Sequence, residues 1–96
     1  MTPYAYYYDV PSTPQMHRAV TAEIGDQRPT GLISHLVVHE NDRLRHYGVW
    51  ERRTDWEQYR DDAIRPAVAR VLRRAGIPEP ALPDEHPLAV IDIQTG

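Results

Sequence analysis

The first predicted elements are a strand and a short amphipathic helix. The run "YAYYYDV" (Tyr4–Val10) is rich in aromatic residues that favour β-structure, and it predicts a strand. In the next segment Thr13 is a good N-cap, Pro14 suits the first helical position and Gly25 suits the position after the last turn. Between them, apolar residues recur every four positions and form one helical stripe: Met16, Val20 and Ile24.

Two β-rich runs separated by two polar residues predict a hairpin. The runs are "LISHLVVHE" (32–40) and "RLRHYGVWE" (43–51), and Asn41 and Asp42 lie between them. An Asn-Asp pair between such runs is typical of a tight turn. The side chains of both strands are therefore expected to alternate between the two faces of a sheet.

The segment 54–76, "TDWEQYRDDAIRPAVARVLRRAG", predicts a second and longer helix. Thr54 and Glu57 have the spacing of a capping box, and Gly76 marks the end of the helix. Pro66 lies inside the pattern and should kink the helix or split it in two. One helical face carries the residues that would pack on the sheet: Trp56, Tyr59, Ala63, Ala67, Val71 and Ala75.

A proline-rich loop, "IPEPALPDEHP" (77–87), leads to the last predicted strand, "LAVIDIQ" (88–94). The element order is then β-α-β-β-α-β, the split βαβ arrangement. This order predicts an α+β fold of the ferredoxin-like class, in which a four-stranded antiparallel sheet carries its helices on one face. With 96 residues, the chain should form a single domain over residues 1–96.

The composition excludes several kinds of chemistry. The chain has no Cys, which excludes disulfides, thiolate metal sites and a cysteine nucleophile. All 11 basic residues are Arg, so there is no lysine for a Schiff base or a phosphate loop. A net charge of −3 argues against a nucleic-acid partner. No apolar run approaches the roughly 20 residues of a membrane helix. The N-terminal "MTPYAYYYDV" does not resemble a signal peptide, and a cytoplasmic location is expected.

With this element order, the chain resembles the dimeric α+β barrel superfamily of ferredoxin-like proteins, and within it the antibiotic-biosynthesis-monooxygenase-like proteins. The resemblance rests on "GLISHLVVHE" as a strand, on "YGVWERRTDWEQY" as a strand that runs into a helix through a Trp, and on the Pro of "IRPAV". It implies that two sheets associate into a barrel and that each subunit holds a small ligand between its sheet and its helices. Members include cofactor-independent oxygenases, cyclases, isomerases and haem-degrading enzymes, so the fold does not choose among these activities.

Apolar residues on both faces of the second predicted strand independently favour a homodimer. Ile33 and Val37 lie on one face, and the other face carries Leu32, Leu36 and Val38. A sheet that helices cover on one side only should expose a polar second face. A second copy of the chain, packed sheet against sheet, would cover the apolar face seen here.

The direction of the histidine side chains depends on the register of the hairpin. A turn at Asn41–Asp42 places His35 opposite Gly48 and Ile33 opposite Trp50. A slip of one residue would move every side chain of a strand to the other face. In the predicted register, one face gathers Ile33, His35, Val37, His39, Leu44, His46, Gly48 and Trp50.

This face is predicted to be the wall of a pocket. Gly48 leaves room for the imidazole of His35 to reach a ligand, and Trp50 adds a flat surface. His46 is diagonal to His35, roughly 7–8 Å away at the backbone, and both could act on one substrate. His39 lies closer to the turn and is expected to be wetter. The other interpretation is that these imidazoles are half-buried and hydrogen-bonded to nearby hydroxyls or carbonyls.

A metal site is the less favoured interpretation, and none is predicted. On a strand, His35 and His39 would stand about 13 Å apart, which is too far to share one ion. A pair of His35 and His46 would need further ligands, for which only Asp9 and Asp92 are candidates.

Other side chains have two possible roles each. Tyr6 and Tyr8 share one strand face, where they either pack or orient a polar ligand atom through a hydroxyl. Trp56 and Tyr59 either anchor the long helix to the sheet or contact a ligand. Asp92, in the last predicted strand, is either at a wet strand end or an acid or base of raised pKa that faces a pocket.

Together these features favour a small, metal-free enzyme without a cofactor. In the absence of a cofactor motif, thiol or lysine, the available chemistry is proton transfer by an imidazole, His35 first and His46 second. The substrate would be an aromatic or polyketide-like small molecule of natural-product biosynthesis, and the reaction an oxygenation, cyclisation or isomerisation. The haem-degrading activity fits less well, because the resemblance requires a pocket Asn and the only one, Asn41, belongs to the turn. The alternative is a non-catalytic homodimer that binds a small hydrophobic ligand.

Overall fold

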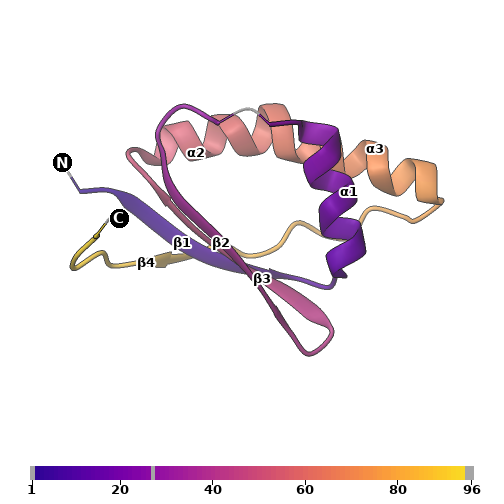
Figure 1. Ribbon diagram of the computed structural model, residues 1–96, viewed down its shortest axis with the longest axis horizontal. Helices are drawn as coiled ribbons and strands as arrows, with labels where there is room; N and C mark the ends of the chain where they lie inside the picture. The colour runs from indigo at the N-terminus through magenta and orange to yellow at the C-terminus, as the bar shows by residue number, and fades with distance from the viewer. Residues whose placement is uncertain (1, 27, 95–96) are drawn as a thin grey trace.

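A computed structural model describes residues 2–26 and 28–94 of the chain. A four-stranded sheet packs against two helical segments, and the second of these is much the longer (Figure 1). In chain order, the elements are β1 (Tyr4–Val10), α1 (Pro14–Ile24), β2 (Leu32–Glu40), β3 (Arg43–Trp50), α2 (Arg53–Tyr59), the π-helical segment η1 (Arg60–Ile64), α3 (Arg65–Ala75) and β4 (His86–Leu88).

The local signals of the first helix act as predicted. Thr13 Oγ1 accepts a hydrogen bond from the backbone N–H of Met16 at 3.1 Å, and Pro14 is the first residue of α1. After the last turn, Gly25 adopts a φ of 90°, and its N–H donates to the carbonyl of Thr21 at 3.0 Å. This φ is one that glycine tolerates well, so the sequence determines both ends of the helix locally.

The sheet confirms the predicted fold class. Its strand order is β2-β3-β1-β4, and every neighbouring pair is antiparallel. Both helical segments cover the same face, because the rings of Tyr8 and His46 stack on that face. Tyr8 lies beside Trp56 of α2, and His46 lies beside His17 of α1. The architecture is therefore the α+β, ferredoxin-like one.

The hairpin has the predicted register over most of its length. Asn41 begins the turn with a φ of 54°, and the pairing places His35 opposite Gly48. The prediction fails at one position, because a β-bulge between Leu32 and Ser34 places Leu32 opposite Trp50. Ile33 is the extra residue of the bulge, and its side chain lies on the opposite face from the histidines.

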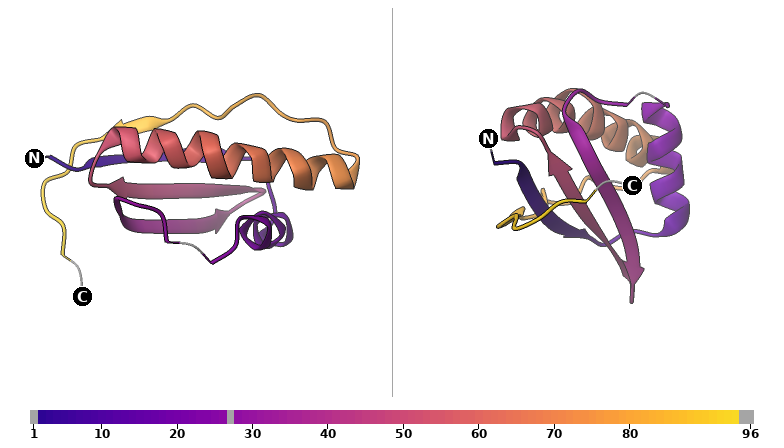
Figure 2. Two further views of the ribbon diagram at one scale, coloured as in Figure 1. Left: turned by 90° about the horizontal axis from the view of Figure 1, so that it is seen from above. Right: turned by 60° about the vertical axis from the view of Figure 1, so that its left-hand side comes forward.

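The long helix starts and continues differently from the prediction. Its N-cap is Arg52, which makes no side-chain capping bond, so the capping box predicted at Thr54 does not form. Pro66 does not split the helix: α2, η1 and α3 run on as one rod (Figure 2). Pro66 has no N–H and cannot donate the usual helical hydrogen bond to the carbonyl of Asp62. The wider π-helical turn just before Pro66 accommodates the loss of this bond.

The last strand is shorter than predicted and lies earlier in the chain. The segment 88–94 was expected to be a strand, but β4 covers only His86–Leu88. Leu88 pairs with Ala5, one residue from the start of β1 at Tyr4, so the following residues have no partner strand. The chain then leaves the sheet, and Ile91 is 93% exposed. Backbone pairing, not side-chain preference, therefore limits this strand.

An aromatic cluster forms the core between the sheet and α2. Trp50 Nε1 donates a hydrogen bond to the hydroxyl of Tyr6 at 3.1 Å, and Tyr6 also stacks on Trp56 at 4.5 Å between ring centroids. Tyr8 completes the cluster. With no Phe in the chain, these rings supply much of the buried area, and the indole N–H of Trp50 is satisfied within the cluster by the hydroxyl of Tyr6.

Candidate functional site

Two histidines from neighbouring strands meet on the helix-covered face of the sheet. His46 of β3 is only 9% exposed, and its ring stacks on Tyr8 at 4.7 Å between centroids. Its Nδ1 lies 3.4 Å from Nε2 of His35 on β2. The alternation of the hairpin predicted this shared face, and the prediction is confirmed.

Burial keeps both imidazoles neutral at neutral pH. Burial, and after it the like charges of the neighbouring His35 and His17, together lower the pKa of His46 from 6.5 to about 4. The pKa of His35 is also lowered, first by burial and then by His17. His35 nevertheless keeps an exposed surface, whereas His46 is enclosed. The pair thus joins one accessible neutral imidazole to one enclosed neutral imidazole.

The third member of the cluster, His17, was missed by the sequence analysis. Its ring is 5.5 Å from the ring of His46 and meets it edge-on. The signal was present in the sequence, because His17 precedes Val20 by three residues and so borders the apolar stripe of α1. Its partner could not be identified without knowing that α1 lies over β3.

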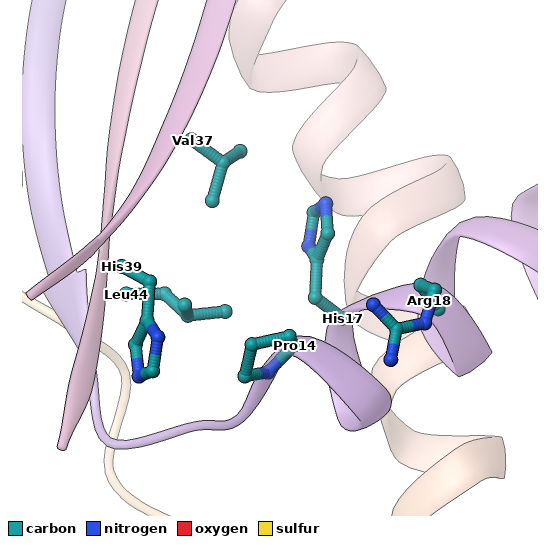
Figure 3. Close-up of a pocket in the computed structure, with 6 residues that line it drawn as sticks. All are labelled: Pro14, His17, Arg18, Val37, His39 and Leu44. Atoms are coloured by element: carbon teal, nitrogen blue, oxygen red, sulfur yellow. The ribbon is translucent and has the colours of Figure 1, made fainter.

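A hollow of about 200 Å³ opens beside the cluster, between α1 and the β2–β3 hairpin. Figure 3 shows side chains from the first turns of α1 facing side chains from the hairpin across this space. His39, predicted to be the wetter histidine, lines it and is exposed. We call this space the α1–hairpin hollow; its lining residues are Pro14, His17, Arg18, Val37, His39 and Leu44.

The space predicted between His35, His46 and Trp50 is filled by protein. Trp50 is 2% exposed and hydrogen-bonded to Tyr6. The room that Gly48 leaves is occupied by the phenol ring of Tyr6, which lies where a Cβ would be. The three predicted side chains share a face, but they line neither the α1–hairpin hollow nor the hollow beside Ile33 and Val49. The prediction of Gly48 as a gap for a ligand is therefore wrong.

Two solved structures share this architecture. One is a protein from Chloroflexus aurantiacus J-10-fl, provisionally named an antibiotic biosynthesis monooxygenase; it matches with a TM-score of 0.62, 17% identity and coverage of 98% of both chains. The other, an anthrone oxidase-like protein, matches with a TM-score of 0.55 and 24% identity. This match covers 95% of the present chain but only 45% of the other. The chain has the antibiotic-biosynthesis-monooxygenase-like fold.

These structural matches confirm the resemblance predicted from the sequence as far as the fold is concerned. At 17% and 24% identity, the matches show a shared backbone arrangement and do not show a shared chemistry. No protein-family model and no curated protein matches the sequence. The functional residues must therefore be argued from the positions of this chain's own side chains.

In this monooxygenase-like fold, the predicted aromatic contact residues belong to the core. Trp56 is buried, and its Nε1 donates to Glu85 Oε1 at 2.9 Å. Arg60 Nη1 donates to the other oxygen of Glu85 at 2.8 Å, so this carboxylate holds the loop before β4 against the long helix. Tyr59 is half-buried and packs on the core cluster. Burial raises the pKa of Tyr8, which keeps this hydroxyl protonated.

Asp92 lies on the side of the sheet opposite to the histidines. It is exposed and lines a second hollow of about 570 Å³, together with Ile33 and Val49 on the opposite face of the sheet. Gln94 Nε2 donates to its carboxylate at 3.5 Å. Because β4 ends at Leu88, Asp92 is not part of the sheet, and the fold does not bring it to the same hollow as the histidines.

Two further observations on the described residues concern metal ions and membranes. In residues 2–26 and 28–94, no three His, Asp or Glu side chains lie close enough to hold one metal ion. In the same ranges, no helix combines the length and the apolar character needed to cross a membrane.

Proposed function

We propose that this protein is a small, metal-free and cofactor-independent enzyme that transfers protons to and from an aromatic small molecule. The observation that carries the proposal is the contact of 3.4 Å between an accessible imidazole, His35, and an enclosed one, His46. A base must be unprotonated and reachable to take a proton, and the lowered pKa of His35 meets the first condition at neutral pH.

The two histidines have different roles in the proposed proton transfer. In the tautomer in which Nε2 of His35 donates to Nδ1 of His46, the Nδ1 lone pair of His35 is free to take a proton from the substrate. His46 then acts as the positioning residue, because it accepts the hydrogen bond that becomes stronger when His35 turns cationic. Stacking on Tyr8 keeps the ring of His46 in place.

Three reaction outcomes are compatible with this base. Removal of a proton from a phenol or an enol leaves an electron-rich anion. The anion can cyclise or isomerise when the proton returns at another atom. With dioxygen as co-substrate, a CH₂ group can instead become a carbonyl, and the second oxygen atom leaves as water with the two hydrogens. The monooxygenase and anthrone-oxidase names of the structural neighbours favour this last outcome for a first assay.

Replacement of His35 tests the proposed base. With anthrone as the first substrate, His35→Ala should lower kcat/KM by about 10²- to 10⁴-fold, the usual contribution of a general base. Oxygen uptake and quinone absorbance measure the rate. His86→Ala is the matched control, because His86 stacks on Tyr7 on the other face of the sheet and should change the rate less than about twofold. Equal activity of wild type and His35→Ala would contradict the proposal.

A non-catalytic binding protein is the second candidate. The close packing of Trp50 and Tyr6 favours it, because the space expected to hold a substrate next to both His35 and Trp50 is filled. Saturable binding of aromatic ligands without turnover of any of them would support this function in place of the enzymatic one.

We also propose that two copies associate through the face of the sheet that the helices leave open. Leu36 is 56% exposed there, and Val38, Tyr47 and Val49 are half-buried beside it. Arg45 lies over the ring of Tyr7 at 4.5 Å on the same face. An exposed apolar sheet face of this kind is typical of an association surface. The homodimer, the cytoplasmic location and a role in natural-product biosynthesis remain predictions.

A charge on the open face should separate the two copies. Leu36→Asp is expected to convert a wild-type dimer into a monomer, because two carboxylates would be buried at the interface without partners. Sedimentation velocity measures the mass of each variant. Leu82→Asp is the control, since Leu82 is slightly more exposed, at 62%, but lies in the proline-rich loop, and this variant should stay dimeric. A monomeric wild type at micromolar concentration would show that this surface has another role.

A further inference from the structure

The α1–hairpin hollow combines nitrogen-bearing and apolar side chains. Its polar lining consists of His17, Arg18 and His39, and its remaining walls are Pro14, Val37 and Leu44. No carboxylate is among these lining residues, although the chain as a whole carries a net charge of −3. The hollow is thus locally basic in an acidic protein, which favours an anion over a cation or a neutral ligand.

Arg18 is the permanent charge of this hollow. Its guanidinium stays protonated at all physiological pH values. It is exposed, and it takes part in none of the ion pairs found among residues 2–26 and 28–94. By contrast, Arg70 and Arg74, on the neighbouring helix α3, both pair with Glu23 of α1. Arg18 therefore keeps its donors free for an external carboxylate.

His17 and His39 add donors on either side of the hollow (Figure 3). An imidazole carries at least one N–H whatever its tautomer or charge, so each ring can donate a hydrogen bond to an anion. His17 is the more enclosed of the two, being half-buried while His39 is exposed. The geometry places one guanidinium and two imidazole donors around one apolar space.

The size of the hollow limits the ligand. A volume of about 200 Å³ lies below the roughly 300–1,000 Å³ of pockets that enclose drug-sized molecules. It suits one six-membered ring with an acidic substituent. The side chains of Val37 and Leu44 offer the apolar surface for the ring, and the nitrogen atoms of α1 lie across from them.

We propose that the α1–hairpin hollow binds the carboxylate end of an aromatic acid, with Arg18 and His17 as its anion partners and Val37 and Leu44 against its ring. This inference rests on the proposed function for its link to catalysis. Val37 precedes His39 and follows His35 on the same strand face, and two residues along a strand span about 7 Å. A ligand held by its carboxylate in the hollow would thus extend along β2 toward His35, and the ring of His17 lies 5.5 Å from that of His46.

Binding of 4-hydroxybenzoate, compared with its uncharged analogue 4-hydroxybenzamide, tests the inference. Titration calorimetry should show the acid bound at least tenfold more tightly than the amide. Backbone amide shifts in an NMR titration should be largest at residues 16–18, 37–39 and 44. Arg18→Gln should remove the preference for the acid and change the affinity for the amide less than twofold. His17→Gln should weaken binding of the acid severalfold.

Arg52→Gln is the matched control, because Arg52 is exposed at the start of α2 and is not among the lining residues. It should leave both affinities within twofold of wild type. Three results would overturn the inference: equal affinity for the acid and the amide, a preference that survives Arg18→Gln, or shifts centred on Ile33 and Val49 of the second hollow. Since Arg18 is exposed, loss of the fold is not expected to obscure the result.

The same measurements separate this inference from the proposed function. His35 does not line the hollow, so His35→Ala should retain the affinity for 4-hydroxybenzoate within twofold. If the acid binds as described while His35→Ala leaves turnover unchanged, the hollow is a binding site and the proposed base is wrong. If His35→Ala abolishes turnover while the acid and the amide bind equally, the base stands and the anion site is wrong.

Discussion

Lowering the pH from 7.5 to 5.0 should reduce the free energy of unfolding by about 2 kcal/mol, mainly through His46. Burial holds the pKa of this imidazole at about 4 in the folded protein, against 6.5 when exposed. Between these two values, the unfolded chain binds more protons than the folded chain. Stability is therefore highest above pH 6.5, falls as the pH falls through this window, and loses nothing further from His46 below about pH 4.

Thermal unfolding followed by circular dichroism measures this effect. For a domain of this size, the melting temperature should fall by about 10 °C between the two pH values. His35, whose pKa is also lowered, adds to the change in the same direction. The window lies above the range in which the paired carboxylates Asp9, Glu23 and Asp61 take up protons, since their pKa values are lowered. The effect of protonating the two imidazoles on stability can thus be measured separately from acid unfolding.

A variant that lacks the His46 imidazole shows whether this residue causes the pH dependence of stability. His46→Phe keeps an aromatic ring against Tyr8 but has no proton to bind, so the change in melting temperature between pH 7.5 and 5.0 should fall to less than half. His86→Phe, on the opposite face of the sheet, should retain the full change. If His46→Phe were as pH-sensitive as wild type, the lowered pKa assigned to His46 would be incorrect.

Gly48→Ala should be among the most destabilising single substitutions in this protein, at about 3 kcal/mol or more. The new methyl group would overlap the ring and hydroxyl of Tyr6. That ring has nowhere to move, because Trp56 stacks on it at 4.5 Å and Trp50 Nε1 donates to its oxygen. In addition, the Trp50 N–H would lose its acceptor if Tyr6 shifted, which leaves a buried donor unpaired.

A double-mutant cycle identifies the cause of this loss. Tyr6→Leu alone should destabilise the fold, but in the Gly48→Ala background it should cost little, because it removes the atoms that clash. A coupling free energy of about 2 kcal/mol in urea unfolding is expected. Ser34→Ala, an exposed position opposite Val49, should change stability by less than about 0.5 kcal/mol. Additive losses from the two substitutions would mean that Tyr6 does not fill the space at Gly48.

Interactions between close neighbours in the sequence were predicted well. Thr13, Pro14 and Gly25 bound the first helix because each acts on backbone groups within one turn. The turn at Asn41 determined the register of the hairpin and placed His35 and His46 on one face, since the side-chain period of a strand is two residues. These local rules also led to the monooxygenase-like fold, which the structural comparisons confirm.

The predictions that failed concern partners that are distant in the sequence. The run 88–94 has the composition of a strand, but only Leu88 of this run pairs with β1, because the later residues run antiparallel past the start of β1 at Tyr4. Gly48 leaves a gap in its own strand, and Tyr6, from a strand more than forty positions earlier, fills it. Whether a gap in one strand becomes a pocket depends on the side chains that other elements bring to it.

The sequence by itself determined the order of the elements, the hairpin register and the two histidines that meet on the sheet, because propensity, turn chemistry and alternation act over a few residues. Only the tertiary structure decided which space stays open. The packing of α1 over the sheet brought His17 to His46 and opened the α1–hairpin hollow, while the aromatic core closed the space beside Trp50. Packing between elements that are distant along the chain decides which spaces stay open. The local sequence of each element does not indicate which side chains of another element will contact it.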